Sequence, residues 1–221
     1  MKQIKSAIMC IGIMFACVGC ASNSDDKMPL DTSENTSVES TVSSMTTEDK
    51  YQNYSHVVPE AKSVYFSSLE EMEDYSDIIV YAVREEGEKP VIERNNNNVY
   101  SAYSFSHVRI EKVYKDMDKT GRELEGKVIT VLENEAVDEE AQTVYHISNY
   151  NMMVPGCEYL LFLKECELNG ETYYVASGVN CGTISVTEDG RDLVRGKKDV
   201  KDPVFDDYRA LWEEAKNKYL Q

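Results

Sequence analysis

Five stretches of the chain either alternate apolar and polar residues or are rich in β-branched and aromatic residues, as strands are. They cover residues 77–84, 100–114, 127–132, 158–167 and 172–186. The alternation in the second stretch is imperfect, so we expect a bulge or a coil within it. Asn95 to Asn98 forms the tip between the first two strands, and Asn169-Gly170 is a strong hairpin signal between the last two. The pattern predicts a mainly β fold, a small five-stranded antiparallel barrel.

Two helices are expected at the ends of this barrel. Ser68-Leu69-Glu70-Glu71 fits a capping box and predicts a short N-terminal helix over 69–74. Asp202-Pro203 opens a C-terminal amphipathic helix, 203–220, with proline in its first turn. Apolar residues recur in it at helical spacing, namely Phe205, Tyr208, Leu211, Trp212, Ala215 and Tyr219. We expect Trp212, the only tryptophan, to pack this helix onto the barrel, and the domain to span 61–221.

The first twenty residues have the pattern of an export signal. Lys2 and Lys5 precede an apolar stretch of twelve residues, 7–18, which is shorter than the roughly 20 residues that span a bilayer. The ending Cys17-Val18-Gly19-Cys20 resembles the lipobox of bacterial lipoproteins, although Cys17 stands where that family usually has leucine. The resemblance implies a signal peptide over 1–19 and a lipidated Cys20 as the mature N-terminus. An ordinary secretory signal is the alternative.

Residues 20–60 are predicted to be a disordered, lipid-anchored stalk. Between residues 21 and 50, twelve of thirty residues are serine or threonine, and acids outnumber bases seven to two. So few apolar residues cannot form a core. The resulting localisation is the extracytoplasmic face of the cell membrane, held by acyl chains on Cys20. The net charge of −17 over the whole chain makes nucleic acid a poor partner.

A family resemblance covers about residues 67–190. The segments Ser76–Val80, 100–114, Lys127–Val131 and Pro155–Leu163 resemble a class of exported bacterial proteins of unknown role. That class is similar to the OB-like barrel of netrin modules and tissue inhibitors of metalloproteinases. The resemblance implies an OB-like fold through its hydrophobic pattern. Those inhibitors act through a cysteine at the mature N-terminus of the barrel, a position with no counterpart here, so it does not imply protease inhibition.

Three cysteines, Cys157, Cys166 and Cys181, lie in the exported domain, where pairing is the usual state. A two-residue turn at Asn169-Gly170 places Leu168 opposite Glu171, which leaves Cys157 and Cys181 one residue out of register. A single bulge would bring these two face to face, so the sequence predicts a Cys157–Cys181 disulfide with Cys166 left over. Three reduced thiols are the alternative.

Catalytic and metal-binding motifs are missing from the sequence. His107, His146 and Cys166 are the candidates for a thiol site, but no local motif joins them. The acidic clusters 133–135 and 138–140 lack the ligand spacing of a calcium loop, and we expect them to be solvated surface. No cofactor and no metal are therefore predicted. The long irregular segment 138–155, which holds His146, is the place where an enzyme would have its lid.

The candidate ligand-binding residues are Asn96, Asn97, Tyr100 and Tyr103. OB-like barrels commonly bind through the face of strands 2 and 3 and the neighbouring loops, and tyrosine combines an apolar ring with a polar tip. The sequence therefore favours a non-catalytic binding module of the cell envelope, with a protein or a glycan as its partner. An extracytoplasmic enzyme with a site around 138–155, or an accessory structural lipoprotein without its own ligand, are the alternatives.

Overall fold

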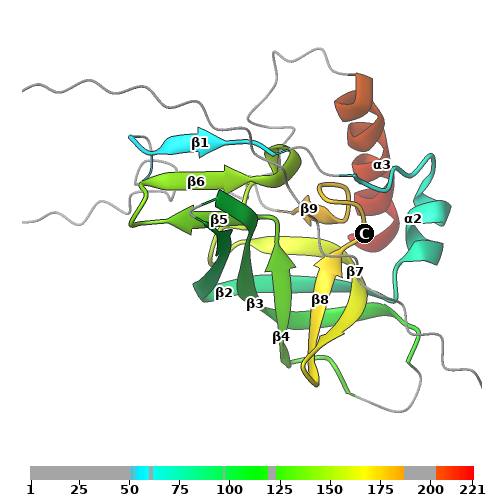
Figure 1. The fold of residues 1–221 in the computed structure, drawn as a ribbon. Coiled ribbons are helices and arrows are strands. Elements are labelled where there is room, and N and C mark those ends of the chain that lie inside the picture. Colours follow the sequence, from blue (N-terminus) through cyan, green and yellow to red (C-terminus); the bar gives the residue numbers. More distant parts are fainter. Residues whose placement is uncertain (1–50, 52, 60–61, 97, 119–122, 187–202) are drawn as a thin grey trace, which may run out of the picture.

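The computed structural model describes residues 51, 53–59, 62–96, 98–118, 123–186 and 203–221 (Figure 1). The predicted signal peptide, the lipidation site Cys20 and most of the predicted stalk lie outside these residues. The helices are α2 (Leu69–Tyr75), the 3-10 turn η1 (Ile147–Asn149) and α3 (Pro203–Tyr219). The strands are β1 (Ser55–Val57), β2 (Ile78–Asn95), β3 (Asn98–Asp116), β4 (Val128–Glu133), β5 (Glu135–Asp138), β6 (Thr143–His146), β7 (Glu158–Leu168), β8 (Glu171–Ala176) and β9 (Thr183–Ser185).

Five of the strands close into a ring. The larger sheet has the order β2-β3-β4-β8-β7-β9, and β2 also pairs with β7, so that β2, β3, β4, β8 and β7 return to their starting point. These five strands correspond to the five predicted from the sequence, and the fold is mainly β. The prediction of a wholly antiparallel five-stranded barrel is wrong, because β4 and β8 pair in parallel at Val131↔Tyr174 and Leu132↔Val175. A second sheet is also present, which the sequence did not predict.

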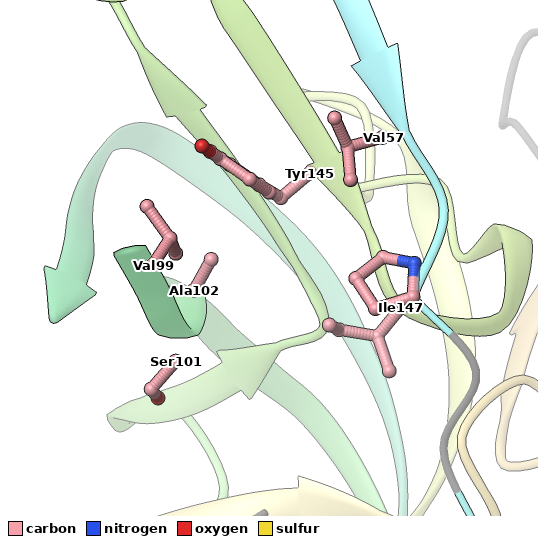
Figure 2. Close-up of a pocket in the computed structure, with 7 residues that line it drawn as sticks. Val57, Val99, Ser101, Ala102, Tyr145 and Ile147 are labelled. Atoms are coloured by element: carbon pink, nitrogen blue, oxygen red, sulfur yellow. The ribbon is translucent and has the colours of Figure 1, made fainter. Parts of the chain in front are cut away.

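The second sheet has three strands in the order β1-β6-β5. β5 and β6 form an antiparallel pair, and β1 adds to β6 in parallel with Val57 opposite Tyr145. Figure 2 shows these two side chains lying near each other on neighbouring strands. The predicted irregular segment 138–155 thus contains β6 and η1. β1 lies on the N-terminal side of the predicted domain boundary at residue 61 and is part of the folded structure.

β2 and β3 form a long hairpin that extends beyond the ring. The predicted first strand ends at Arg84, but β2 continues to Asn95 along β3. β7 pairs only with Ile78–Val83 of β2, so Pro90 lies where β2 has β3 alone beside it and a missing N–H is tolerated. The expected bulges lie in β3, where the register shifts leave Tyr100 as an additional residue.

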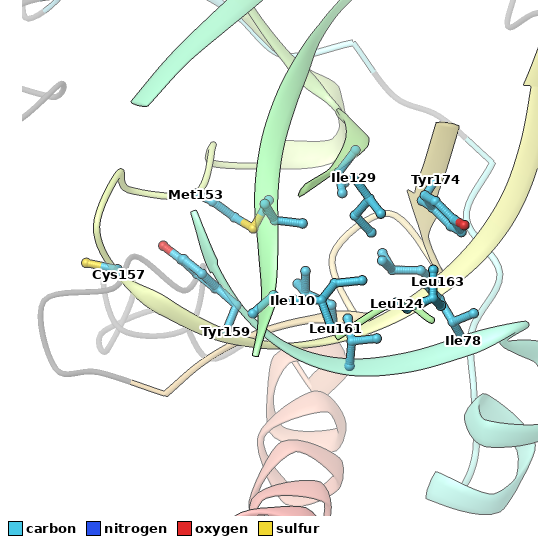
Figure 3. Close-up of a cluster of buried hydrophobic side chains, with 14 residues drawn as sticks. Ile78, Ile110, Leu124, Ile129, Met153, Cys157, Tyr159, Leu161, Leu163 and Tyr174 are labelled. Carbon is cyan, nitrogen blue, oxygen red and sulfur yellow. The ribbon is translucent and has the colours of Figure 1, made fainter. Parts of the chain in front are cut away.

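The larger hydrophobic cluster fills the inside of the ring (Figure 3). Alternate residues of each strand point inward, which is why Ile78, Val80 and Ala82 of β2 all belong to it while Ile79 does not. Its members are Ile78, Val80, Ala82, Val108, Ile110, Leu124, Ile129, Val131, Met153, Cys157, Tyr159, Leu161, Leu163 and Tyr174. The cluster gives the ring a packed interior.

The second cluster joins both helices to the outside of the ring. Ser68 caps α2 by accepting a hydrogen bond from the Glu71 N–H, as predicted, whereas the Glu71 carboxylate accepts from Ser67 N and Oγ rather than from the Ser68 N–H of a complete capping box. Leu69 and Met72 of α2 pack with Leu211, Trp212 and Ala215 of α3 against the outward residues Ile79, Leu160 and Phe162. The packing role predicted for Trp212 is confirmed: its Nε1 donates to Cys181 O at 2.9 Å. No helix in the described part of the chain is long and apolar enough to cross a membrane.

The predicted Cys157–Cys181 disulfide is absent, and both of these cysteines are free thiols. The predicted register itself is correct, since β7 and β8 pair from Leu168↔Glu171 to Leu163↔Ala176. After that point the chain turns, and β9 returns to β7 with Leu161 opposite Thr183. Cys157 therefore faces the interior of the ring and Cys181 faces the helices, where burial raises the pKa of its thiol to about 12.

Candidate functional site

A small pocket lies where the hairpin tip meets the second sheet (Figure 2). Three separate parts of the chain line it: the β1 segment, the start of β3 and the β6–η1 segment. The lining residues are Val57, Pro59, Val99, Ser101, Ala102, Tyr145 and Ile147. None of these side chains carries a charge, and Ser101 and Tyr145 supply the hydroxyl groups. The pocket suits an apolar group better than an ion.

Local hydrogen bonds place the pocket walls. The Ser55 N–H donates to Gln142 O at 2.9 Å, and the Ser148 N–H donates to Pro59 O at 3.0 Å, which fixes both ends of the β1 segment. β1 is one of the two edge strands of its sheet, and its three residues are exposed. On the other side, the bulge at Tyr100 changes the alternation of β3 next to Val99. One wall of the pocket therefore depends on a short edge strand.

Two of the predicted ligand-binding residues come together on the hairpin. Tyr100 is 37% exposed, and Tyr103 is half-buried. Burial, together with the nearby Glu93 and Tyr100, raises the pKa of Tyr103. Its ring meets Phe105 edge-on at 5.4 Å between centroids. Tyr103 thus packs along the hairpin against Phe105, whereas Tyr100 is exposed next to Val99 and Ser101 of the pocket lining.

The predicted asparagines belong to the hairpin turn. Asn96 is exposed and has φ of 49°, a left-handed conformation that asparagine tolerates. Asn95 pairs with Asn98 across this turn. Asn97 lies outside the described residues. The left-handed turn conformation therefore explains why an asparagine stands at position 96, without invoking a role in ligand binding.

A buried carboxylate lies between the pocket and the ring interior. Glu133 has no exposed surface and accepts hydrogen bonds from Tyr150 Oη at 3.1 Å, from Met153 N at 2.6 Å and from Ser106 Oγ. Arg84, which is also buried, places its Nε 3.4 Å from Glu133 Oε1. Burial raises the pKa of Glu133 to about 7, although all four partners favour the charged form.

A second polar chain runs from β5 to β1. His146 Nδ1 lies 3.1 Å from Glu135 Oε2 and 3.1 Å from Tyr150 O. Its Nε2 lies 2.8 Å from His56 Nδ1, and His56 Nε2 lies 3.3 Å from Tyr51 O. This chain links the edge strand to the centre of the second sheet, on the strands that also carry Val57 and Tyr145.

The candidates for a thiol site do not converge. His107 is exposed on β3 opposite Thr130, and Cys166 lies on β7 opposite Tyr173, with β4 and β8 between those strands. His146 lies in the other sheet. Within the described residues, no group of three or more histidine, cysteine or acidic side chains is arranged to hold a metal ion.

Sequence reasoning missed the buried acids. Glu133 and Glu135 were expected on a solvated surface, but Glu133 is fully buried and Glu135 is 7% exposed. The signal for Glu133 is its place in β4, where Ile129 and Val131 alternate with it on the inward face. Arg84 carries the same signal, since it continues the inward alternation of Ile78, Val80 and Ala82 in β2. No comparable signal marks His56, whose partner His146 is distant in the sequence.

Comparison with known proteins gives no assignment: no protein-family model matches this chain, and no curated protein matches it either. A functional proposal must therefore come from the pocket, its aromatic border and the polar chains beneath it.

Proposed function

We propose that this protein is a non-catalytic binding module of the cell envelope, held at the extracytoplasmic face of the membrane by a lipid on Cys20. The signal-like residues 1–19 and the lipobox-like ending at Cys20 support the anchor. The serine- and threonine-rich segment that follows would place the folded domain away from the bilayer as a stalk.

The same proposal describes the ring as an OB-like barrel. Its support is the order of the five strands around the ring, β2-β3-β4-β8-β7, which closes through β2–β7. The first three strands are neighbours in chain order, whereas β8 precedes β7. Such an order is a Greek-key connection, as in OB folds. In that fold the second and third strands commonly face the ligand, and here the second strand of the ring is β3, which carries Tyr100 and Tyr103.

The uncharged lining of the pocket carries the proposal. A catalytic site needs an acid, base or nucleophile within reach of its substrate. Here no charged side chain lines the pocket, and the charged groups of the two polar chains pair with one another, Arg84 with Glu133 and Glu135 with His146. Apolar lining beside the exposed Tyr100 favours recognition over chemistry. The enzyme alternative would need a different site.

A protein partner fits the pocket better than a glycan. The lining is mainly valine, proline, alanine and isoleucine, which bury an apolar side chain favourably but offer few partners for sugar hydroxyls. Tyr100, with 37% of its surface exposed, would extend the contact surface along the hairpin. The partner is therefore expected to present an apolar side chain to the pocket.

Site-specific photo-cross-linking in cells that express the full-length chain tests the proposal. A photoreactive residue replaces Ser101, inside the pocket, or Val128, which is 52% exposed at the start of β4 opposite Arg109. We expect a discrete protein adduct from position 101 that Tyr100→Ala weakens, and no such adduct from position 128. Identical adducts from both positions, or none from position 101, would contradict the proposed site.

A further inference from the structure

His56 and His146 form a stacked, hydrogen-bonded pair at the junction of β1 and β6. Their ring centroids are 5.1 Å apart with an interplanar angle of 10°, and Nδ1 of His56 lies 2.8 Å from Nε2 of His146. His56 is in the middle of β1, next to Val57 of the pocket wall. His146 is the last residue of β6, between Tyr145 and Ile147, which also line the pocket.

The ring contacts of this pair require three hydrogens. The Tyr51 carbonyl oxygen opposite His56 Nε2 can only accept, so that nitrogen must carry a hydrogen. Nδ1 of His146 faces two acceptors, Glu135 Oε2 and Tyr150 O, and must carry one as well. The contact between the two rings needs a third. Two neutral imidazoles bring two hydrogens, whereas an imidazole and an imidazolium bring three.

We propose that His56 and His146 are a proton-sharing latch, which holds β1 on β6 when the pair carries one positive charge and releases it when that proton is lost. Because Val57 and Pro59 follow His56 directly, release of β1 would remove one wall of the pocket. The latch itself depends only on the histidine geometry. Its effect on ligand binding rests on the proposed function, as regulation of that same site.

The charged groups around the pair favour its single positive charge. Glu135 of β5 contacts His146 directly. Glu139, in the turn between β5 and β6, accepts hydrogen bonds from the phenols of Tyr51 and Tyr54 beside β1. Behind Tyr150, Glu133 is compensated by Arg84, and Asp138 at the end of β5 pairs with Arg94.

The expected pH dependence follows from the hydrogen count. The contact between the two rings needs the third hydrogen, so docking of β1 is expected where the pair carries its shared proton and is expected to weaken as the pH rises and that proton is lost. Histidine changes charge between about pH 5 and 8. At still lower pH, a fourth hydrogen would place two N–H groups against each other across the 2.8 Å contact. Docking is therefore strongest in a window near pH 6.

Nuclear magnetic resonance on the full chain tests the latch. In wild type at pH 6, the ¹⁵N shifts should show protonated Nε2 in His56, protonated Nδ1 in His146 and a shared hydrogen between the other two nitrogens. The protection factor of the Ser55 amide, which donates to Gln142 O, reports the docking of β1. We expect this protection to be about tenfold lower at pH 8.5 than at pH 6, the effect of losing one hydrogen bond.

Two matched variants complete the experiment. His56→Gln should abolish the pH dependence of Ser55 protection, whereas His107→Gln, which removes the exposed histidine of β3, should leave it unchanged. Equal Ser55 protection at both pH values in wild type, or the same pH dependence in His56→Gln, would overturn the latch. Cross-linking from position 101 at the same two pH values separates the latch from the proposed binding site. If Ser55 protection changes with pH as expected but no adduct forms, the proposed binding site is contradicted and the latch is not.

Discussion

The buried Glu133 gives the sharpest test of the energetics of this fold. Replacing it by glutamine keeps the shape of the side chain and removes the titrating group. A simple comparison at one pH would mix two effects, because the glutamine amide also meets four donor groups, from Tyr150, Met153, Ser106 and Arg84. The difference in unfolding free energy between wild type and Glu133→Gln changes with pH only through the titration of Glu133, so its pH dependence isolates that titration.

The size and sign of that change come from the pKa of Glu133. It is about 7 in the folded protein against an ordinary value of 4.5, because burial disfavours the charged form. The folded state binds this proton more tightly, so the stability that it contributes is present below pH 4.5 and is lost as the pH rises through 7. The full effect is roughly 3 kcal/mol, of which about 2 kcal/mol falls between pH 5.5 and pH 8.

Urea unfolding followed by the fluorescence of Trp212 measures this effect between pH 5.5 and pH 8, above the pI of about 4.6 where the protein would precipitate. Relative to wild type, the free energy of unfolding of Glu133→Gln should rise by about 2 kcal/mol over this range. Glu123→Gln, which removes an exposed carboxylate, serves as the control and should show a nearly constant difference. A constant difference for Glu133→Gln as well would refute a buried, proton-binding Glu133.

Three further predictions concern packing and the thiols. Gly182→Ala should lower the unfolding free energy by about 2 kcal/mol or more in urea, because a Cβ there would lie 2.6 Å from Phe162 O. Trp212→Phe removes the donor to the Cys181 carbonyl and should cost about 1–3 kcal/mol, measured by circular dichroism during unfolding. Alkylation in denaturant without reductant should modify both Cys157 and Cys181 completely, and a disulfide-linked peptide joining them would contradict the structure.

Local signals in the sequence predicted the parts of the fold that local chemistry determines. The Asn169-Gly170 turn and the helix N-cap at Ser68 both form as expected, since each needs only a few neighbouring residues. The parallel pair β4–β8 and the addition of β1 to β6 depend on distant partners, and strands of three or four residues carry almost no periodicity.

The failed disulfide shows where counting along a hairpin stops being valid. Pairing follows the predicted register as far as Leu163↔Ala176, and then residues 177–182 turn away before β9 returns. Gly182 fits this turn because its missing side chain leaves room for the backbone of Ser177. No residue type announces a shift of several positions, so the predicted single bulge was too small a correction.

Of the residues in and around the candidate site, the sequence pointed only to Tyr100 and Tyr103, and their role in binding stays a prediction. Tyr100 and Tyr103 could be chosen because they follow one another on a strand next to a recognisable turn. The histidine pair could not, since His56 and His146 are brought together by strand pairing across 90 positions. Inward positions of a strand are expected to be hydrophobic, so the charged Glu133 was not expected there. Only its alternation with Ile129 and Val131 points to burial.

The two polar chains meet in the segment that follows η1, and this explains how the second sheet is joined to the ring. The N–H groups of the consecutive residues Met152 and Met153 donate to Glu135 and Glu133 respectively. Tyr150 also belongs to both chains, because its phenol donates to Glu133 while its carbonyl lies 3.1 Å from His146 Nδ1. A displacement of this segment would therefore disturb the buried acid and the histidine pair together, although more than one strand separates Glu133 from β1. Ile147 of the pocket lining lies in η1, which directly precedes this segment, so the pocket is connected to both polar chains through the backbone of η1.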